Sequence, residues 1–445
     1  MTLATLALLI CGAVASATDD TPPADRDADI FGESAAPASS DTTTRSDTGD
    51  RLVAQTAAED DKLTLGSRMY LRLDYAASVR GRALTQPFSS PSLLDVYLDA
   101  RPNERIRAFA NGRLLYDFTA AGAETRAQLN ELWMKFDVGR VLFLTAGTQP
   151  VRGGTGRFWN PTDFLNQQRK DPLAAFDERL GVTMVKAHVP LEGLGTNLYA
   201  IANLDGATRP DNVGGALRAE MVLGPSELSL SIGKRQGDAW RLGGDLSAGA
   251  GPFDLKAEVA LLHGVGAPYY RGRFDPARWS LPTAESRANE WIPQAVVGLE
   301  WGINYTDEDA VYLGAEYFYN GFGYTSARKY PWLLYNHAFV PFYTGEQYAA
   351  AYVTLPDPGR LRDTTFIVST LGNLSDRSFV SRFDYRVRVL TYLDLVTFVS
   401  VHYGKIGEFH YGLEVAAVPA VPELAAGMHI PQPFIDAGLG LQLKF

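Results

Sequence analysis

The chain has 445 residues, a formal net charge of −10 and one cysteine, Cys11. A single cysteine cannot form an internal disulfide, which excludes a disulfide-stapled fold. No uninterrupted apolar stretch of about 18 residues follows the first 17, so a membrane-spanning helix is excluded too. Any structure that spans a membrane must then be a closed β-barrel, because only helices and closed barrels satisfy every backbone polar group in hydrocarbon.

The N-terminal part differs in character from the rest. A short apolar run ends in Ala15-Ser16-Ala17 and predicts a secretory signal peptide over 1–17. Residues 18–61 include 12 acids and 3 bases, too polar a mixture to bury a core, and we expect a disordered acidic periplasmic tail. Removing these from 51 acids and 41 bases leaves 39 against 38. The negative charge therefore belongs mostly to the tail, and 62–445 is nearly neutral.

From residue 62 onward, apolar and polar side chains alternate with a period of two, a pattern that a strand can use and a helix cannot. The clearest apolar rows are Leu63, Leu65, Met69, Leu71, Leu73 and Tyr75 near the start, and Ile435, Ala437, Leu439, Leu441, Leu443 and Phe445 at the end. We count eighteen segments of about 9 to 15 residues, the length that a tilted strand needs to cross a bilayer. Sixteen is the main alternative, because part of 404–416 fits either an extra strand or an outer loop.

The connections between these segments alternate between tight and often long. The long ones lie at roughly 76–91, 150–179, 264–290, 320–346 and 404–432. Short periplasmic turns and longer outer loops are typical of membrane barrels. We therefore predict an all-β fold over 62–445, a transmembrane antiparallel up-and-down β-barrel of about 18 strands. A soluble barrel or sandwich is disfavoured, because the outward rows would leave large apolar faces in water.

The predicted signal peptide, the alternating strands and the terminal Phe445 resemble the Gram-negative outer-membrane porin and porin-like channel superfamily. The resemblance covers about 62–445. It implies an outer-membrane location, contact with lipid, and recognition of the C-terminal strand by the outer-membrane assembly machinery. It also implies small hydrophilic solutes as ligands, with no cofactor, no metal and no nucleic acid. The third outer loop of this superfamily commonly folds into the barrel and narrows it, and the third outer connection here is 150–179.

This connection is the most distinctive stretch of the sequence. Three glycines near 155 allow a sharp entry, and Phe158 and Trp159 are predicted to anchor the loop against the wall. Thr162 or Asp163 suits the cap of a short helix, and Asp171 followed by proline suits a second. The residues assigned to the constriction are Arg152, Arg157, Asp163, Arg169, Lys170 and Asp171. An ordered cap over the outer rim is the alternative for this loop.

The inward rows carry charges that differ around the ring. The bases near the closure seam are Arg68, Arg72, Arg105, Arg107, Arg113, Arg382, Arg386 and Arg388, offset in part by acids such as Asp384. The middle strands contribute the acids Asp245, Asp254, Glu258, Glu300 and Glu316. Opposed walls would produce a transverse field that orients dipolar solutes, since low-dielectric walls focus field lines across a wet channel. The alternative is that these charges pair and keep the interior wetted.

Other functional classes fit less well. The six histidines are scattered and no Gly-x-Ser-x-Gly element occurs, so we do not expect an enzyme. A tail of 44 residues is too short for the folded plug of an energy-coupled receptor. We predict a channel for passive, charge-biased diffusion of small hydrophilic solutes, with the third outer loop as its constriction. A polymer-export or surface-binding barrel is the alternative. We also expect the aromatic residues between 319 and 343 to pack the outer loops over the mouth, and binding of a sugar or an apolar ligand is the alternative.

Overall fold

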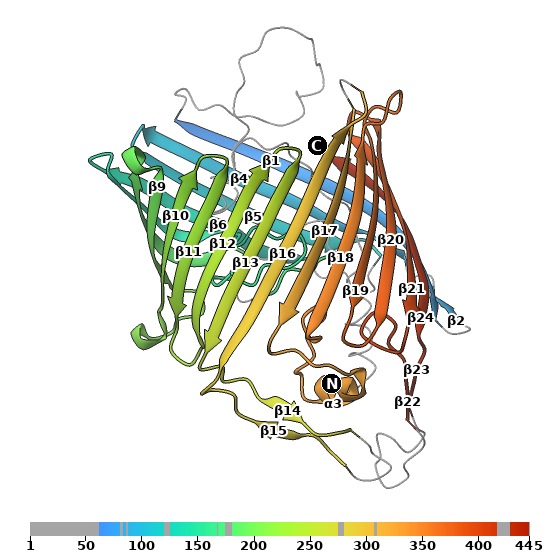
Figure 1. Ribbon diagram of the computed structural model, residues 1–445. Coiled ribbons are helices and arrows are strands. Elements are labelled where there is room, and N and C mark those ends of the chain that lie inside the picture. The colour runs from blue at the N-terminus through green and yellow to red at the C-terminus, as the bar shows by residue number, and fades with distance from the viewer. Residues whose placement is uncertain are drawn as a thin grey trace.

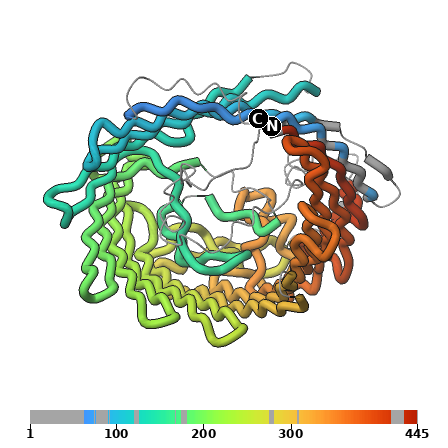
Figure 2. The backbone as a smooth tube through the Cα atoms, turned by 90° about the horizontal axis from the view of Figure 1, so that it is seen from above, coloured from blue at the N-terminus to red at the C-terminus, as the bar shows by residue number. Residues whose placement is uncertain are grey.

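The computed structural model describes residues 62–80, 83–85, 88–119, 125–166, 168–173, 180–274, 280–306, 309–415 and 428–444. The predicted signal peptide, the acidic tail and the terminal Phe445 lie outside these residues. Within them, eighteen long antiparallel strands form a closed barrel, which confirms the predicted fold class and strand number (Figures 1 and 2).

Successive barrel strands pair with one another around the ring. They are β1 (Leu63–Arg80), β4 (Pro91–Asn103), β5 (Ile106–Asp117), β6 (Arg126–Val138), β7 (Leu142–Gln149), β8 (Val182–Leu191), β9 (Thr196–Asn203), β10 (Gly214–Leu223), β11 (Ser226–Lys234), β12 (Trp240–Ala250), β13 (Phe253–His263), β16 (Trp291–Asn304), β17 (Ala310–Asn320), β18 (Gln347–Pro356), β19 (Thr364–Asn373), β20 (Ser378–Leu390), β21 (Leu393–Gly404) and β24 (Pro433–Lys444). The first and last of these close the ring, with a register that runs from Tyr70 opposite Lys444 to Arg80 opposite Pro433.

The remaining elements lie in the connections. They are β2 (Ala83–Thr85), β3 (Phe88–Ser89), β14 (Tyr269–Arg271), β15 (Thr283–Glu285), β22 (Leu413–Val415), β23 (Met428–Ile430), helix α3 (Tyr330–Tyr335) and the 3-10 turns η2 (Glu192–Leu194), η3 (Pro210–Asn212) and η5 (Ala327–Lys329). β22 pairs with β23 in a separate two-stranded sheet. Of the ambiguous stretch, the described residues 405–415 therefore lie in a long loop and add no strand to the barrel.

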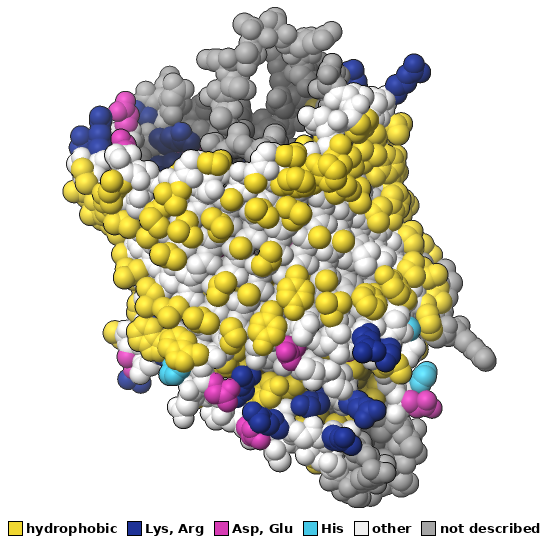
Figure 3. All heavy atoms as spheres, viewed as in Figure 1, with side chains coloured by type: hydrophobic (Ala, Val, Ile, Leu, Met, Phe, Trp, Pro, Cys, Tyr) yellow, Lys and Arg dark blue, Asp and Glu magenta, His cyan; other side chains and the backbone are white. Residues whose placement is uncertain are grey.

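The predicted alternation sets which side chains face outward. Leu63, Leu65 and Leu73 of β1 are 39%, 40% and 48% exposed, whereas Arg72 is only 8% exposed. Apolar side chains cover the outer wall between two rims where charged residues gather (Figure 3). A polar interior behind an apolar exterior is the reverse of a soluble protein, and it suits a barrel surrounded by lipid. Among the described residues, no helix is long and apolar enough to cross a bilayer.

The two ends of the barrel differ. Short turns such as 104–105, 224–225 and 251–252 form one end, whereas β14, β15 and α3 lie in the long loops of the other (Figure 1). A buried cluster of Tyr270, Tyr324, Tyr330, Leu333 and Tyr411 joins three of those long loops. This confirms that the aromatic residues pack the outer loops, which need a small core of their own to stay ordered.

Candidate functional site

In its described residues, 150–166 and 168–173, the connection between β7 and β8 lies within the ring of strands (Figure 2). Its contacts reach β13 and β17, which lie several strands away from β7 around the ring. Two carboxylates of the wall hold its backbone, and an aromatic cluster holds its side chains.

Glu258 of β13 is the first of these carboxylates. It is 1% exposed and accepts backbone N–H bonds from Thr155 and Gly156, both at 2.6 Å, and from Thr162 at 3.2 Å. The Thr162 hydroxyl donates a further bond at 2.7 Å. Gly154 lies so close that a Cβ atom would stand 2.5 Å from the carboxylate, and its φ is +85°. Only glycine suits that position.

Glu316 of β17 is the second. Three consecutive backbone N–H groups donate to its carboxylate: Arg157 at 2.7 Å, Phe158 at 3.0 Å and Trp159 at 2.8 Å. Successive amides that converge on one anion form a nest, and here the anion is a side chain of the protein itself. The turn at 157–159 therefore has a fixed place on the wall.

The predicted aromatic anchor is confirmed. Trp159 is fully buried, with its ring centroid 5.6 Å from that of Phe318 and 5.5 Å from that of Tyr348. Its Nε1 donates to the carbonyl of Phe342 at 3.0 Å. Phe158 packs edge-on against Tyr352 at 5.8 Å.

Further along, the loop packs against the strands before β13. The Phe164 ring lies over Gly243 of β12, where a Cβ atom would approach it to 2.8 Å. Arg241 donates from Nη1 to the Phe164 carbonyl at 3.0 Å. Asn166 ties the loop to itself by donating to the Val151 carbonyl at 2.6 Å.

The predicted helix at Thr162 or Asp163 is wrong. The described residues of 150–173 form turns and bends without a helix, because the Thr162 hydroxyl binds Glu258 and the Asp163 carboxylate accepts from Asn166. Asp171 accepts from the backbone of Leu173 at 2.9 Å, as a cap would. The rest of that second predicted helix falls outside the described residues.

Two cationic residues that were predicted to project into the channel, Arg157 and Lys170, instead contact the wall or the loop itself. The Arg157 guanidinium lies over the Tyr352 ring at 4.0 Å and reaches Glu300 at 4.0 Å. Lys170 donates to the Arg157 carbonyl at 2.7 Å. Arg152 and Arg169 are exposed, the latter 5.4 Å from the centroid of Tyr343.

The prediction that the acids of the middle strands line the open channel needs correction. Glu258 and Glu316 were expected to face the channel, but the loop backbone covers both. Asp245 is also buried, and Arg218 holds it with two bonds at 3.0 and 3.1 Å. Glu300 accepts a hydrogen bond from Tyr352, and Asp254 is half-buried.

The bases near the seam pair with neighbouring carboxylates, as the alternative interpretation expected. The pairs are Arg107 with Asp99 at 3.0 Å, Arg113 with Asp95 at 2.6 Å, Arg382 with Asp384 at 2.7 Å and Arg386 with Asp394 at 2.9 Å. Arg72 is buried, whereas Arg68 is exposed and lies 5.9 Å from the centroid of Tyr97.

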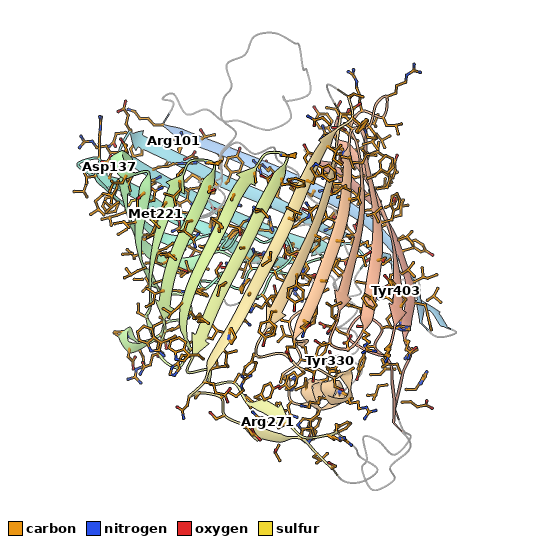
Figure 4. The ribbon with its side chains drawn as sticks, viewed as in Figure 1. Arg101, Asp137, Met221, Arg271, Tyr330 and Tyr403 are labelled. Atoms are coloured by element: carbon orange, nitrogen blue, oxygen red, sulfur yellow. The ribbon has the colours of Figure 1, made fainter. Side chains whose placement is uncertain are left out.

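Two of the predicted wall residues lie at the rim. Arg105 is exposed in the turn 104–105, and Arg388 is half-exposed near Asp363 at 3.7 Å. Arg105 is a turn residue with no inward or outward face, so alternation cannot place it, whereas Arg388 lies near the end of β20 beside a shift of register. Arg101 and Asp137 mark this short-turn end, opposite Arg271 and Tyr330 (Figure 4).

Sequence reasoning missed Arg218, Tyr348 and Tyr352, which shape the wall around the loop. Arg218 and Glu220 alternate with Leu217, Ala219 and Met221, and Leu217 is 58% exposed, so the period-two pattern already placed the two charged residues inward. No comparable signal marks the tyrosines, because a tyrosine ring suits either face of a barrel strand.

Among the described residues, no group of three or more His, Cys, Asp or Glu side chains could hold a metal ion. Comparison of the sequence with protein-family models and with curated proteins finds no match.

Solved structures of similar shape do exist. A triple mutant of Rhodopseudomonas blastica porin is 12% identical, with a TM-score of 0.44 over 86% of this chain and 100% of that one. The outer membrane protein opdK from Pseudomonas aeruginosa is 10% identical, with a TM-score of 0.47 over 86% and 98% of the two chains. The barrel architecture of this chain is established by its own strand pairing rather than by these distant likenesses.

Proposed function

We propose that this chain is an outer-membrane channel for passive diffusion of small hydrophilic solutes, with the segment 150–179 as its constriction. The observation that carries the proposal is the attachment of this segment to Glu258 and Glu316 on the inner wall. Six hydrogen bonds from backbone N–H groups hold this segment at fixed points of the wall. The segment should therefore keep the pore radius constant. The apolar outer face and polar interior support placement in a membrane.

We further propose that the constriction favours anions. The loop backbone encloses the negative charges of Glu258 and Glu316, whereas Arg152 and Arg169 are exposed. A positive charge in a narrow channel between low-dielectric walls attracts anions and repels cations. Transport then depends on pore radius and fixed charge alone, with no bond made or broken.

The chain ends complete the proposal. We propose that 1–17 directs secretion, that 18–61 lies in the periplasm, and that the strand ending in Phe445 is recognised by the assembly machinery. Polymer export would need a continuous basic track along the pore. The seam arginines instead pair with carboxylates, so we do not propose export.

Conductance of the refolded barrel in planar bilayers tests the function. Deleting 155–170 should raise single-channel conductance, because it removes the segment held across the lumen. A matched deletion within the outer loop 204–213 should leave conductance nearly unchanged. If the wild-type barrel passes no current, the channel proposal is wrong. If the 155–170 deletion leaves conductance equal or lower, this segment is not the constriction.

A further inference from the structure

A small cavity lies where the loop segment 164–166 meets the wall near the long-loop end of β9 to β12. Its volume is about 50 Å³, and Arg235, Asp238 and Arg241 are among the residues that line it. A cavity needs only about 10 to 15 Å³ of such volume to hold one water molecule. This one therefore has room for the head of a small oxyanion.

Two arginines of this cavity bond only to carbonyl oxygens. Arg241 donates to the Phe164 carbonyl, and Arg235 donates from Nε to the Asn212 carbonyl at 3.0 Å and from Nη2 to that of Asp205. Within the described part of the chain, neither guanidinium forms an ion pair. Five N–H donors on each planar group leave several available to a ligand.

The local charge is positive. Lys234, Arg235 and Arg241 line the cavity against a single acid, Asp238. Arg169 of the loop adds a positive charge that acts on Arg241, and Asp163 and Asp238 oppose it. A planar guanidinium matches the two oxygens of a carboxylate or phosphate, and such charge-assisted bonds are about twice as strong as neutral ones.

Another inward arginine of the same wall, Arg218, has carboxylate partners. Arg218, two strands before β12, is 9% exposed and binds both Glu220 and Asp245. Arg241 faces the same lumen without a carboxylate of its own. Desolvating a guanidinium without a counter-ion costs free energy, which an anion from solution would recover.

We propose that this cavity is a binding site for small oxyanions, either the carboxylate of an organic acid or inorganic phosphate. The inference deepens the proposed function, on which it rests, by naming the class of solute. Its position beside Phe164 lets an anion that enters from the long-loop end bind next to the loop before it passes.

Equilibrium dialysis of labelled inorganic phosphate, and separately of labelled acetate, against the detergent-solubilised barrel tests the site without requiring conduction. Arg241→Gln should weaken binding on the order of tenfold, the effect of losing one or two hydrogen bonds to a charged group. Asp238→Asn should tighten it. The control is Arg140→Gln, which removes an exposed arginine from a turn at the other end and should leave binding unchanged.

Arg241→Lys separates the binding role from a structural one. It keeps the charge and a donor for Phe164 but loses the planar fork, so it should fold and bind with intermediate affinity. Wild-type protein that binds neither probe would overturn the proposal, as would Arg241→Gln behaving like Arg140→Gln. A conducting barrel that binds no anion refutes this site alone. A non-conducting barrel with Arg241-dependent binding refutes the channel and leaves the site intact.

Discussion

The two sides of the inner wall hold their carboxylates in different ways. Near the seam, Asp95 and Asp99 bind guanidinium groups of the next strand. Across the ring, Glu258 and Glu316 bind backbone amides of the loop, and neither forms an ion pair within the part of the chain that the structure describes. The first arrangement cancels charge within the wall, whereas the second uses the charge of the wall to hold a separate segment. An inward carboxylate therefore has two possible partners, and each partner implies a different role.

The largest effect should come from neutralising both loop anchors. The double variant Glu258→Gln with Glu316→Gln weakens six hydrogen bonds that backbone N–H groups donate to the two carboxylates. At about 1 kcal/mol for each hydrogen bond, the free energy that docks the loop on the wall should fall by roughly 6 kcal/mol or more. Hydrogen exchange of the 155–162 amides measures this loss. The control is Asp254→Asn, which removes the same charge from the same strand outside the loop contact. Protected amides in the double variant would show that the loop does not depend on these carboxylates.

A smaller effect is expected at the seam. Arg113→Gln removes the ion-pair partner of the buried Asp95 and should lower the free energy of unfolding by about 2 kcal/mol. This loss is smaller than the roughly 3 to 5 kcal/mol expected for breaking a fully buried pair, because about a quarter of the Arg113 side chain is exposed. Adding Asp95→Asn should restore most of the loss. A double-mutant cycle from urea unfolding in lipid vesicles measures the coupling. Additive losses would contradict the pairing.

A third carboxylate, that of Glu408, lies in the long loops rather than on the inner wall. Glu408 accepts hydrogen bonds from the Tyr348 hydroxyl at 2.6 Å, the Asn373 amide at 2.8 Å and the Phe342 backbone, and no described residue forms an ion pair with it. Burial, with the charge of Asp376 nearby, raises the pKa of Glu408 to about 7. The folded loops therefore bind a proton more tightly than the unfolded chain does.

The raised pKa sets the sign of a pH dependence. Because the folded pKa lies above the ordinary 4.5, the loop packing should be tightest below pH 4.5 and weaken as the pH rises through 7. Since Glu408 is partly exposed, we expect a loss of about 1 to 2 kcal/mol. Proteolysis of the outer loops at pH 5 and pH 8 measures it. Glu408→Gln should flatten the profile, and an unchanged profile would assign the dependence to another group.

The smallest effect concerns ion selectivity. Arg68 is exposed and no carboxylate pairs with it among the described residues, so Arg68→Gln should lower the permeability ratio of anions over cations. We expect a change below about twofold, since salt screens an exposed charge within about 10 Å. The paired double variant Arg113→Gln with Asp95→Asn removes no net charge and should leave the ratio unchanged. Reversal potentials in a salt gradient compare the two.

The barrel could be predicted from sequence because a period of two fixes the face of every residue in a strand. Leu73 and Arg72 differ in exposure for this reason alone. The strand count was harder, since β22 has the composition of a barrel strand. Whether it pairs with β23 or joins the ring depends on contacts that no local pattern encodes.

The loop site could be predicted only in part. Adjacent aromatic residues in a loop indicated the anchor at Phe158 and Trp159. The partner of Glu258 could not be inferred, because it binds Thr155 across 103 positions of the chain. Alternation places a carboxylate inward, but it cannot say whether backbone amides or water will meet it there. Glu258 and Glu316 meet loop amides for that reason, and the field between opposed walls stays a prediction.

The pairing of β1 with β24 has a consequence for assembly. Of the barrel strands, β1 is synthesised first and β24 last, so a barrel sheet that lacks either strand has two open edges with unpaired N–H and C=O groups. Such edges pair readily with other chains. Loss of β24 would expose β1 and β21 together and yield aggregates rather than a smaller ring.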